Sequence, residues 1–239
     1  MSTRWYSDRV HEEITLVRWG SYGRPVLVFP SAGGDSEEIE RNGLIDACAE
    51  LIAGGQVKVY SLDSVAGQAM MVKSGSPQHR TWLLNQFHDC VRREVVPAIH
   101  TDLGGQAMEI IATGPSIGAF NAVAALCRYP DVFCTAIGMS GSYRIERFYD
   151  QPWSDDLYYA APLQFLPSLE GPQLDLLRTR YAVLASGEGA WEDVGDSWLM
   201  ASALGAKSVP NRVDNWGPQW DHEWPTWHRM LPQYLRELL

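Results

Sequence analysis

Apolar and polar positions along the chain follow two alternating patterns. Short, mostly apolar runs cover 25–30, 57–63, 109–114, 133–140 and 181–187, 14–20 alternates between apolar and polar residues, and N-R-V-D-N-W (211–216) is expected to be the final strand. Longer segments place apolar residues at helical spacing over 36–53, 80–103, 117–129, 196–207 and from about 225 onward. This alternation is typical of an α/β protein with a largely parallel sheet, to which 14–20 adds an early antiparallel strand.

The alternation fails between residues 143 and 171, which are rich in aromatic residues, prolines and aspartates. We interpret 143–171 as an irregular insertion or a short lid. No linker, internal repeat or low-complexity segment divides the chain, so residues 1–239 are expected to form a single domain. Many α/β folds of this length do so and bury a large core.

The overall charge narrows the classes of partner. The chain has 29 acidic and 19 basic residues, a net charge of −10, which argues against nucleic acid or a membrane as the main partner.

The first residues lack the apolar stretch of a signal peptide and no run is long enough to span a bilayer, so a cytoplasmic location is expected. The four cysteines are scattered without a C-x-x-C pair, which predicts buried, reduced thiols and no metal site.

A glycine-flanked serine stands where a predicted strand gives way to a predicted helix. The segment reads G-P-S-I-G and has Ser116 at its centre. The pattern is common by chance, but this context is that of a nucleophile elbow, whose sharp turn leaves little room for side chains beside the serine. We therefore expect Ser116 to be a nucleophile. Ser140, in G-M-S-G-S, has a different glycine spacing and no clear helix after it, and we interpret it as a loop residue.

A serine nucleophile needs a base, usually a histidine that a carboxylate orients. His222 lies in the loop between the last predicted strand and the final helix, in the sequence W-D-H-E-W-P-T-W, where enzymes with this elbow carry their histidine. We predict that His222 is the general base. His79, His88 and His100 fall in the helical segment before the elbow, where surface or core positions are expected.

The acid should lie in the loop that follows the strand 181–187, which reads E-G-A-W-E-D-V-G-D. Glu188 follows the strand too closely to reach the histidine loop easily. Asp196 has the position of a helix N-cap. Glu192 and Asp193 both remain candidates, and Glu192 is preferred.

Two N–H groups should stabilise a developing oxyanion. One is the backbone of Ile117, directly after the nucleophile. The other should come from the loop S-A-G-G-D after the strand 25–30, where Ala32 and Gly33 allow a substrate carbonyl to approach the main chain closely.

With these motifs in order along most of the chain, the sequence resembles the putative esterase family of the α/β-hydrolases. That family includes esterase D (S-formylglutathione hydrolase), feruloyl esterases, enterochelin esterases and mycolyltransferases. The resemblance implies an α/β-hydrolase fold, with a mostly parallel central sheet flanked by helices and no large cap domain, with Ser116 as nucleophile and His222 as base. The chain departs from the family pattern in having Ser31-Ala32 in place of His-Gly, and Pro115 in place of a histidine.

Tryptophans are concentrated in the loops proposed for the acid and the base. We expect Trp191, Trp220 and Trp224 to bind substrate, and the site to be open and shallow.

The sequence thus predicts a serine carboxylic ester hydrolase that uses an acyl-enzyme, no cofactor and no metal, and acts on small-molecule esters with short acyl or aryl groups. An acyltransferase on the same scaffold and a non-catalytic hydrolase-fold binding protein are the alternatives. Whether the chain works alone or as a homo-oligomer stays open.

Overall fold

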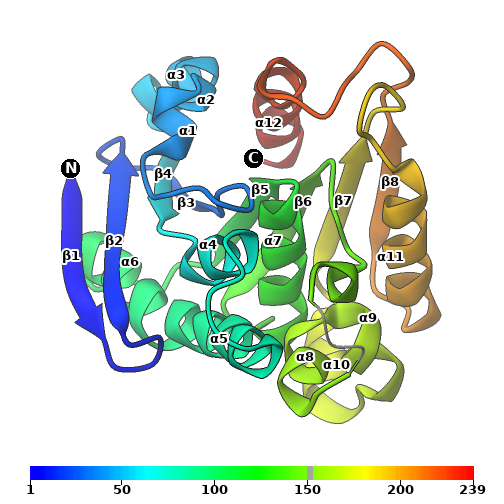
Figure 1. Cartoon of the computed structure of the whole chain (residues 1–239). Coiled ribbons are helices and arrows are strands. Elements are labelled where there is room, and N and C mark those ends of the chain that lie inside the picture. The colour runs from blue at the N-terminus through cyan, green and yellow to red at the C-terminus, as the bar shows by residue number, and fades with distance from the viewer. Residues whose placement is uncertain (150–152) are drawn as a thin grey trace.

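An eight-stranded sheet runs through the molecule in the order β1-β2-β4-β3-β5-β6-β7-β8 (Figure 1). The computed structural model describes residues 1–149 and 153–239. The strands are β1 (Ser2–Ser7), β2 (Glu12–Trp19), β3 (Arg24–Val28), β4 (Val57–Leu62), β5 (Ile110–Pro115), β6 (Phe133–Met139), β7 (Tyr181–Ser186) and β8 (Asn211–Asn215). Strand β2 pairs antiparallel with β1 and β4, and the other pairs are parallel. The mostly parallel sheet with one early antiparallel strand is confirmed.

The edge strand β1 was not predicted from the sequence. Its residues, S-T-R-W-Y-S, are mostly polar and exposed, and they pair only with β2 at the edge of the sheet. A strand with one free edge and little buried surface needs no apolar run, which is the signal that the sequence analysis used.

The segment expected to form one helix over 36–53 forms three short ones. They are α1 (Glu38–Arg41), α2 (Leu44–Ala47) and α3 (Ala49–Ala53). Gly43 separates the first two with φ of 78°, a left-handed conformation that a continuous helix cannot contain. The apolar spacing survives the interruption, since Ile39, Leu44 and Leu51 are all buried.

The long helical segment before β5 is continuous from Pro77 to Asp102. It consists of α5 (Pro77–Cys90), a π-helical turn η1 (Val91–Val95) and α6 (Val96–Asp102). Pro97 neither ends nor breaks the helix, because the wider turn directly before it accommodates a residue without an N–H. The short helix α4 (Val65–Met71), between β4 and α5, was not predicted.

Short helices fill most of the segment between β6 and β7. They are η2 (Ile145–Phe148), α8 (Asp155–Ala160), α9 (Pro162–Phe165), η3 (Leu166–Ser168) and α10 (Gly171–Leu177). Short helices and turns thus alternate with loops in the described part of 143–171, residues 150–152 lie outside the described residues, and the interpretation of this segment as an insertion or a short lid stays a prediction. These helices are too short, and too often started by proline, to show a clear helical period.

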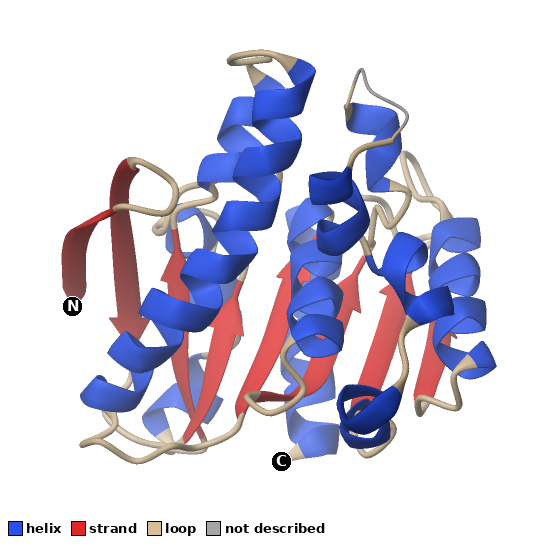
Figure 2. Ribbon diagram, turned by 90° about the horizontal axis from the view of Figure 1, so that it is seen from below, coloured by secondary structure: helices blue, strands red, loops and turns tan. Residues whose placement is uncertain are grey.

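Helices cover both faces of the sheet (Figure 2). The remaining ones are α7 (Ile117–Arg128), α11 (Val194–Ala206) and α12 (Trp224–Leu238). Alternate residues of β3 enter two separate cores: Leu27 packs with α4, α5 and α7, while Val26 and Val28 pack with α1–α3 and α12. All four cysteines are buried and unpaired. Over 1–149 and 153–239, no helix has both the length and the apolar character needed to cross a bilayer.

Candidate active site

Ser116 lies on the turn that joins β5 to α7, in a backbone conformation that side chains rarely adopt. Its φ is 57° and its ψ is −119°, the geometry of the first central residue of a type II′ turn, where glycine is favoured. A hydrogen bond of 2.9 Å from Ser116 N to Met139 O, at the end of β6, fixes the turn. The predicted strand, turn and helix around Ser116 are confirmed.

The two glycines of G-P-S-I-G are sterically required. A Cβ on Gly114 would overlap the carbonyl oxygen of Phe29 in the neighbouring chain segment and the backbone of Gly118. A Cβ on Gly118 would overlap that same oxygen and the carbonyl of Pro30. The helix can therefore start immediately beside β3 only because both positions lack side chains.

The groups at the head of α7 are free to act on a ligand. The hydroxyl of Ser116 is half-buried, and among the residues that the structure describes neither it nor the N–H of Ile117 has a hydrogen-bond partner. Unpaired N–H groups at a helix N-terminus attract negative charge. This end of α7 can thus stabilise an anion formed next to Ser116.

His222 stands in the loop between β8 and α12. Its backbone N–H donates to Ala190 O at 3.0 Å, which ties the loop to the segment after β7. The imidazole packs edge-on against Trp227, with ring centroids 5.3 Å apart. Its Nδ1 lies 3.8 Å from Oε2 of Glu192, an ion-pair distance longer than a direct hydrogen bond. In the described part of the chain no hydrogen bond joins His222 to Ser116; catalytic hydrogen bonds often close only with substrate bound.

Glu192 is a buried carboxylate with defined partners on both oxygens. Its side chain is 1% exposed, against 21% for His222. Oε1 accepts a hydrogen bond of 2.5 Å from Ser140 Oγ, and Oε2 accepts one of 2.9 Å from Ser186 Oγ. Burial alone would raise the pKa of Glu192, but His222 and the two hydroxyls lower that pKa more, so it lies below its ordinary value. The carboxylate is therefore held ionised next to the imidazole.

The neighbouring acid faces another way. Asp193 lies 2.7 Å from Nη2 of Arg144 and 3.8 Å from Nη1 of Arg147, in a partly exposed ion-pair cluster. Asp196 is fully buried, pairs with the same two arginines and accepts a hydrogen bond from Tyr143 N. The expectation that Asp196 is the N-cap is wrong: α11 begins at Val194, and Asp196 stands in its first turn.

Ser140 has a part that the sequence analysis missed. It lies at the end of β6 with φ of 51°, and its N–H donates to Ala185 O of β7 at 2.7 Å. Its hydroxyl donates to Glu192 and accepts a 2.9 Å hydrogen bond from Nε1 of Trp227. The sequence signal that could have found it is its position, since it ends the strand beside the one that carries Ser116.

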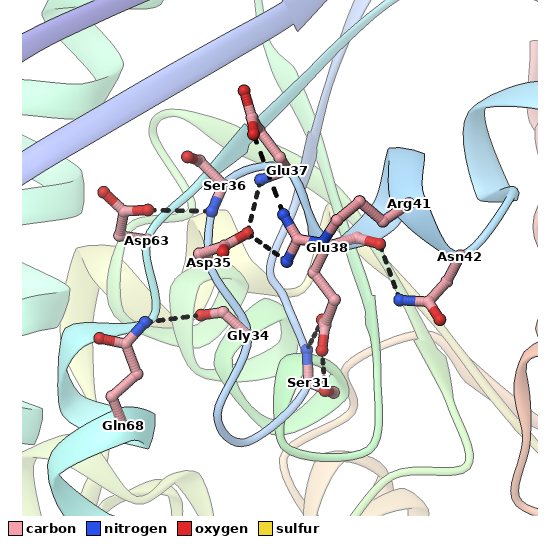
Figure 3. Close-up of polar contacts among 10 residues, drawn as sticks. All are labelled: Ser31, Gly34, Asp35, Ser36, Glu37, Glu38, Arg41, Asn42, Asp63 and Gln68. Carbon is pink, nitrogen blue, oxygen red and sulfur yellow. Dashed lines mark hydrogen bonds and ion pairs between the residues drawn. The ribbon is translucent and has the colours of Figure 1, made fainter.

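The loop after β3 is held by Glu38 of α1 (Figure 3). Glu38 Oε2 accepts a 2.8 Å hydrogen bond from Ser31 N, and Oε1 accepts one of 2.5 Å from Ser31 Oγ. Gly34 leaves the space for this carboxylate, because a Cβ there would overlap it and the Pro30 ring. Ser31, which with Ala32 stands in place of the His-Gly pair of the family that the sequence resembles, is thus bonded to a glutamate.

The two predicted oxyanion donors of that loop lie between these anchors. Gly34 O accepts from Nε2 of Gln68 at 3.2 Å, also drawn in Figure 3, and the carbonyl of Ala32 abuts Gly67 of α4. In the described part of the chain, the N–H groups of Ala32 and Gly33 have no hydrogen-bond partner. The loop is therefore rigid at both ends, with free N–H groups in between.

The three predicted substrate-binding tryptophans have different surroundings. Trp191 is 92% exposed and has φ of 65°. Trp224 packs edge-on against Trp227, with centroids 5.0 Å apart, and so lies behind the ring that supports His222. Trp220 packs against Trp216 at 5.1 Å and lines a groove of about 1130 Å³ between α2 and α12, which includes neither Ser116 nor His222.

No family model and no curated protein matches the chain. Solved structures do. A ferulic acid esterase has a TM-score of 0.72 and 15% identity, over 100% of this chain and 98% of that one. An S-formylglutathione hydrolase from Agrobacterium tumefaciens has a TM-score of 0.69 and 12% identity, over 99% of this chain and 92% of that one. The enterochelin esterase from Shigella flexneri has a TM-score of 0.64 and 16% identity, over 100% of this chain but 57% of its own.

These neighbours carry names that the sequence resemblance includes, and they share the architecture of this chain from end to end. At these low identities the likeness shows the fold. The predicted α/β-hydrolase fold is confirmed: a mostly parallel sheet flanked by helices, with no large cap domain in the described residues.

Proposed function

We propose that this chain is a serine carboxylic ester hydrolase that works through an acyl-enzyme. The observation that carries the proposal is the conformation of Ser116, a serine held at φ 57° and ψ −119° at the head of α7. The pairing of buried Glu192 with His222 supports it, because an imidazole beside an ionised carboxylate is the usual partner of such a serine. The esterase names of the structural neighbours are consistent with it.

In the proposed mechanism Ser116 Oγ attacks the ester carbonyl carbon and its proton passes to His222. Glu192, next to Nδ1, orients the imidazole and stabilises its protonated form. The tetrahedral oxyanion accepts hydrogen bonds from the N–H of Ile117 and from the loop that contains Ala32 and Gly33. Collapse expels the alcohol, which takes the proton from the imidazole. Water then attacks the acyl-enzyme with the same base, and Ser116 is regenerated without a cofactor or metal.

We propose small esters with short acyl or aryl groups as substrates. The partial exposure of Ser116 and His222 supports an open site. Trp191 precedes the acid in the chain and offers an exposed ring to an apolar substituent. An acyltransferase would use the same residues, and it would be distinguished by whether an added alcohol competes with water for the acyl-enzyme.

The decisive experiment compares wild-type protein with Ser116→Ala on p-nitrophenyl acetate and on a fluorophosphonate probe. Loss of the nucleophile should lower kcat/KM by about 10³-fold or more and abolish labelling, with the thermal transition unchanged. Ser202→Ala, which alters an exposed serine of α11, is the matched control and should behave as wild type. Near-wild-type hydrolysis by Ser116→Ala would disprove the mechanism. A wild-type protein that fails to react with the probe would instead indicate a binding protein.

A further inference from the structure

A second cavity lies at the opposite end of α7 from Ser116. It has a volume of about 330 Å³, is partly open to solvent, and is lined by residues of α7, α8, α9, η3, α10 and the end of α5. Arg128, the last residue of α7, lies in the wall of the cavity. Four aromatic residues also line the cavity: Tyr129, Tyr158, Tyr159 and Phe165. Because α7 has 12 residues, this cavity is about 18 Å from the elbow. It is therefore separate from the candidate active site.

The guanidinium of Arg128 is nearly buried, with 15% of its side chain exposed. Its Nη1 lies 3.2 Å from Nδ1 of His88, and the other ring nitrogen, Nε2, lies 2.9 Å from Oδ1 of Asn121. Since an amide oxygen only accepts, His88 carries its proton on Nε2, and Nδ1 accepts from Arg128. Burial and the nearby arginine hold the pKa of His88 at about 3, so the imidazole is neutral and compensates no charge.

The one carboxylate in the wall of the cavity is already shared. Asp89 Oδ1 accepts a 3.0 Å hydrogen bond from Tyr129 and lies 3.9 Å from Nη2 of Arg128, while Oδ2 lies 3.4 Å from Nε of Arg93. Asp89 thus faces two guanidinium groups, of which only that of Arg128 lies in the wall of the cavity, and it compensates the charge of Arg128 only in part. The nearly buried guanidinium of Arg128 therefore has only a long ion pair to a carboxylate that it shares with Arg93, and a ligand anion could add the close interaction that Arg128 lacks.

We propose that this cavity binds a small aromatic carboxylate. A carboxylate matches the planar guanidinium of Arg128, whose Nε and Nη2 make no hydrogen bond within the described chain, the contact of Nη2 with Asp89 being a 3.9 Å ion pair. The tyrosine and phenylalanine rings provide flat apolar walls for the body of the ligand, and the volume is in the range of small-molecule sites. Asp89 selects against a second negative charge, so a monoanion is favoured over a phosphate ester.

Benzoate is the probe, and Ser116→Ala protein removes any reaction at the elbow. Isothermal titration should show benzoate binding at millimolar concentration and weaker binding of benzamide, which has the same shape without the charge. Arg128→Gln in this background should raise the Kd for benzoate at least about tenfold. Arg92→Gln is the control, because it removes a nearby charge that pairs with Asp131 outside the cavity. It should change the Kd for benzoate less than about threefold.

The location can be checked without a variant at Arg128. Addition of benzoate should shift the backbone amide resonances of Tyr129, Tyr158 and Phe165. Shifts confined to the loops around Ser116 and His222, no binding at millimolar benzoate, or equal affinity for benzoate and benzamide would each overturn the proposal. Because the measurements use Ser116→Ala, they do not depend on whether the protein hydrolyses esters.

Discussion

Ser140 Oγ donates a 2.5 Å hydrogen bond to Oε1 of Glu192 and accepts one from Trp227, whose ring also supports His222. One hydroxyl therefore connects the surroundings of Glu192 with those of His222. Together with Ser186 it occupies both oxygens of Glu192 and fixes the carboxylate beside the imidazole. The position of the Glu192 carboxylate depends on the ends of β6 and β7 as much as on its own loop.

Replacement of the two candidate acids should have unequal effects. Glu192→Gln keeps the shape but removes the charge beside His222, so kcat/KM should fall by about 10³-fold. Asp193→Asn alters a partly exposed ion pair with Arg144 and should change kcat/KM less than about threefold. Steady-state kinetics on p-nitrophenyl acetate measures both. A larger loss in Asp193→Asn would transfer the role of acid to that residue.

Ser140→Ala tests the role of the supporting hydroxyl. Removing a hydrogen bond that lowers the pKa of Glu192 should raise that pKa, so the acid limb of the kcat/KM profile should move to higher pH. We expect kcat to fall by about tenfold, with little change in KM. Trp227→Phe retains the edge-on packing and removes only the Nε1–H donor, so its effect should be smaller. A uniform loss of activity with an unchanged pH profile would mean that Ser140 is only structural.

Glu38 should matter for the rate of acylation more than for substrate binding. Glu38→Ala removes both acceptors of Ser31 and frees the loop that carries Ala32 and Gly33. Because a looser loop presents its N–H groups less well to the oxyanion, kcat should fall about tenfold to a hundredfold while KM stays nearly constant. Fluorophosphonate labelling should slow in parallel. Glu37→Ala, an exposed neighbour with a 3.9 Å pair to Arg41, is the control; equal losses in both variants would contradict this role.

The glycines around Ser116 predict a clear difference in stability. Gly114→Ala or Gly118→Ala would place a methyl group against the backbone beside β3, so either should lower the free energy of unfolding by about 3 kcal/mol or more. Gly205→Ala, in α11, meets no atom within 4 Å and should raise the stability by about 0.5–1 kcal/mol. Urea unfolding at neutral pH measures all three. Elbow variants as stable as Gly205→Ala would show that the turn can relax.

Buried His88 should make the protein acid-sensitive. The pKa of His88 falls from 6.5 to about 3 in the folded chain. Between these values the unfolded chain binds a proton on this imidazole and the folded chain does not. The free energy of unfolding should therefore decrease as the pH drops below about 6.5, by about 2 kcal/mol between pH 7 and pH 5. His88→Gln should lack this component, whereas His100→Gln should retain it. Urea unfolding at the two pH values decides; equal slopes in His88→Gln and wild type would refute it.

The strands and helices that bury apolar residues on both sides could be predicted from the sequence. The apolar pattern of strands β3 to β7 and of helix α7 predicts these elements, and G-P-S-I-G falls where the strand pattern changes into the helix pattern. Strand β1 and the short helices between β6 and β7 were not, because local pairing and proline positions, rather than periodicity, determine them. The same limit applies to α1–α3, which Gly43 separates through its φ angle.

For the candidate site, the sequence places a residue well only where a single loop defines it. Ser116 and His222 are each set by the elements on either side. Glu192 and Asp193 are adjacent, and their different surroundings arise from Ser140, Ser186 and Arg144, which lie elsewhere in the chain. No spacing rule relates those residues, so only the folded arrangement distinguishes the two carboxylates.

The turn at Ser116 also bears on why the residue is a serine. A backbone at φ 57° and ψ −119° costs a residue with a side chain about 1–3 kcal/mol, a strain that glycine would not have. The hydroxyl returns none of that energy through a hydrogen bond within the described chain. Selection for stability alone would therefore favour glycine at this position. In the proposed mechanism this strain accompanies the placement of a reactive hydroxyl at the head of α7, so stability is given up where the chemistry is proposed to occur.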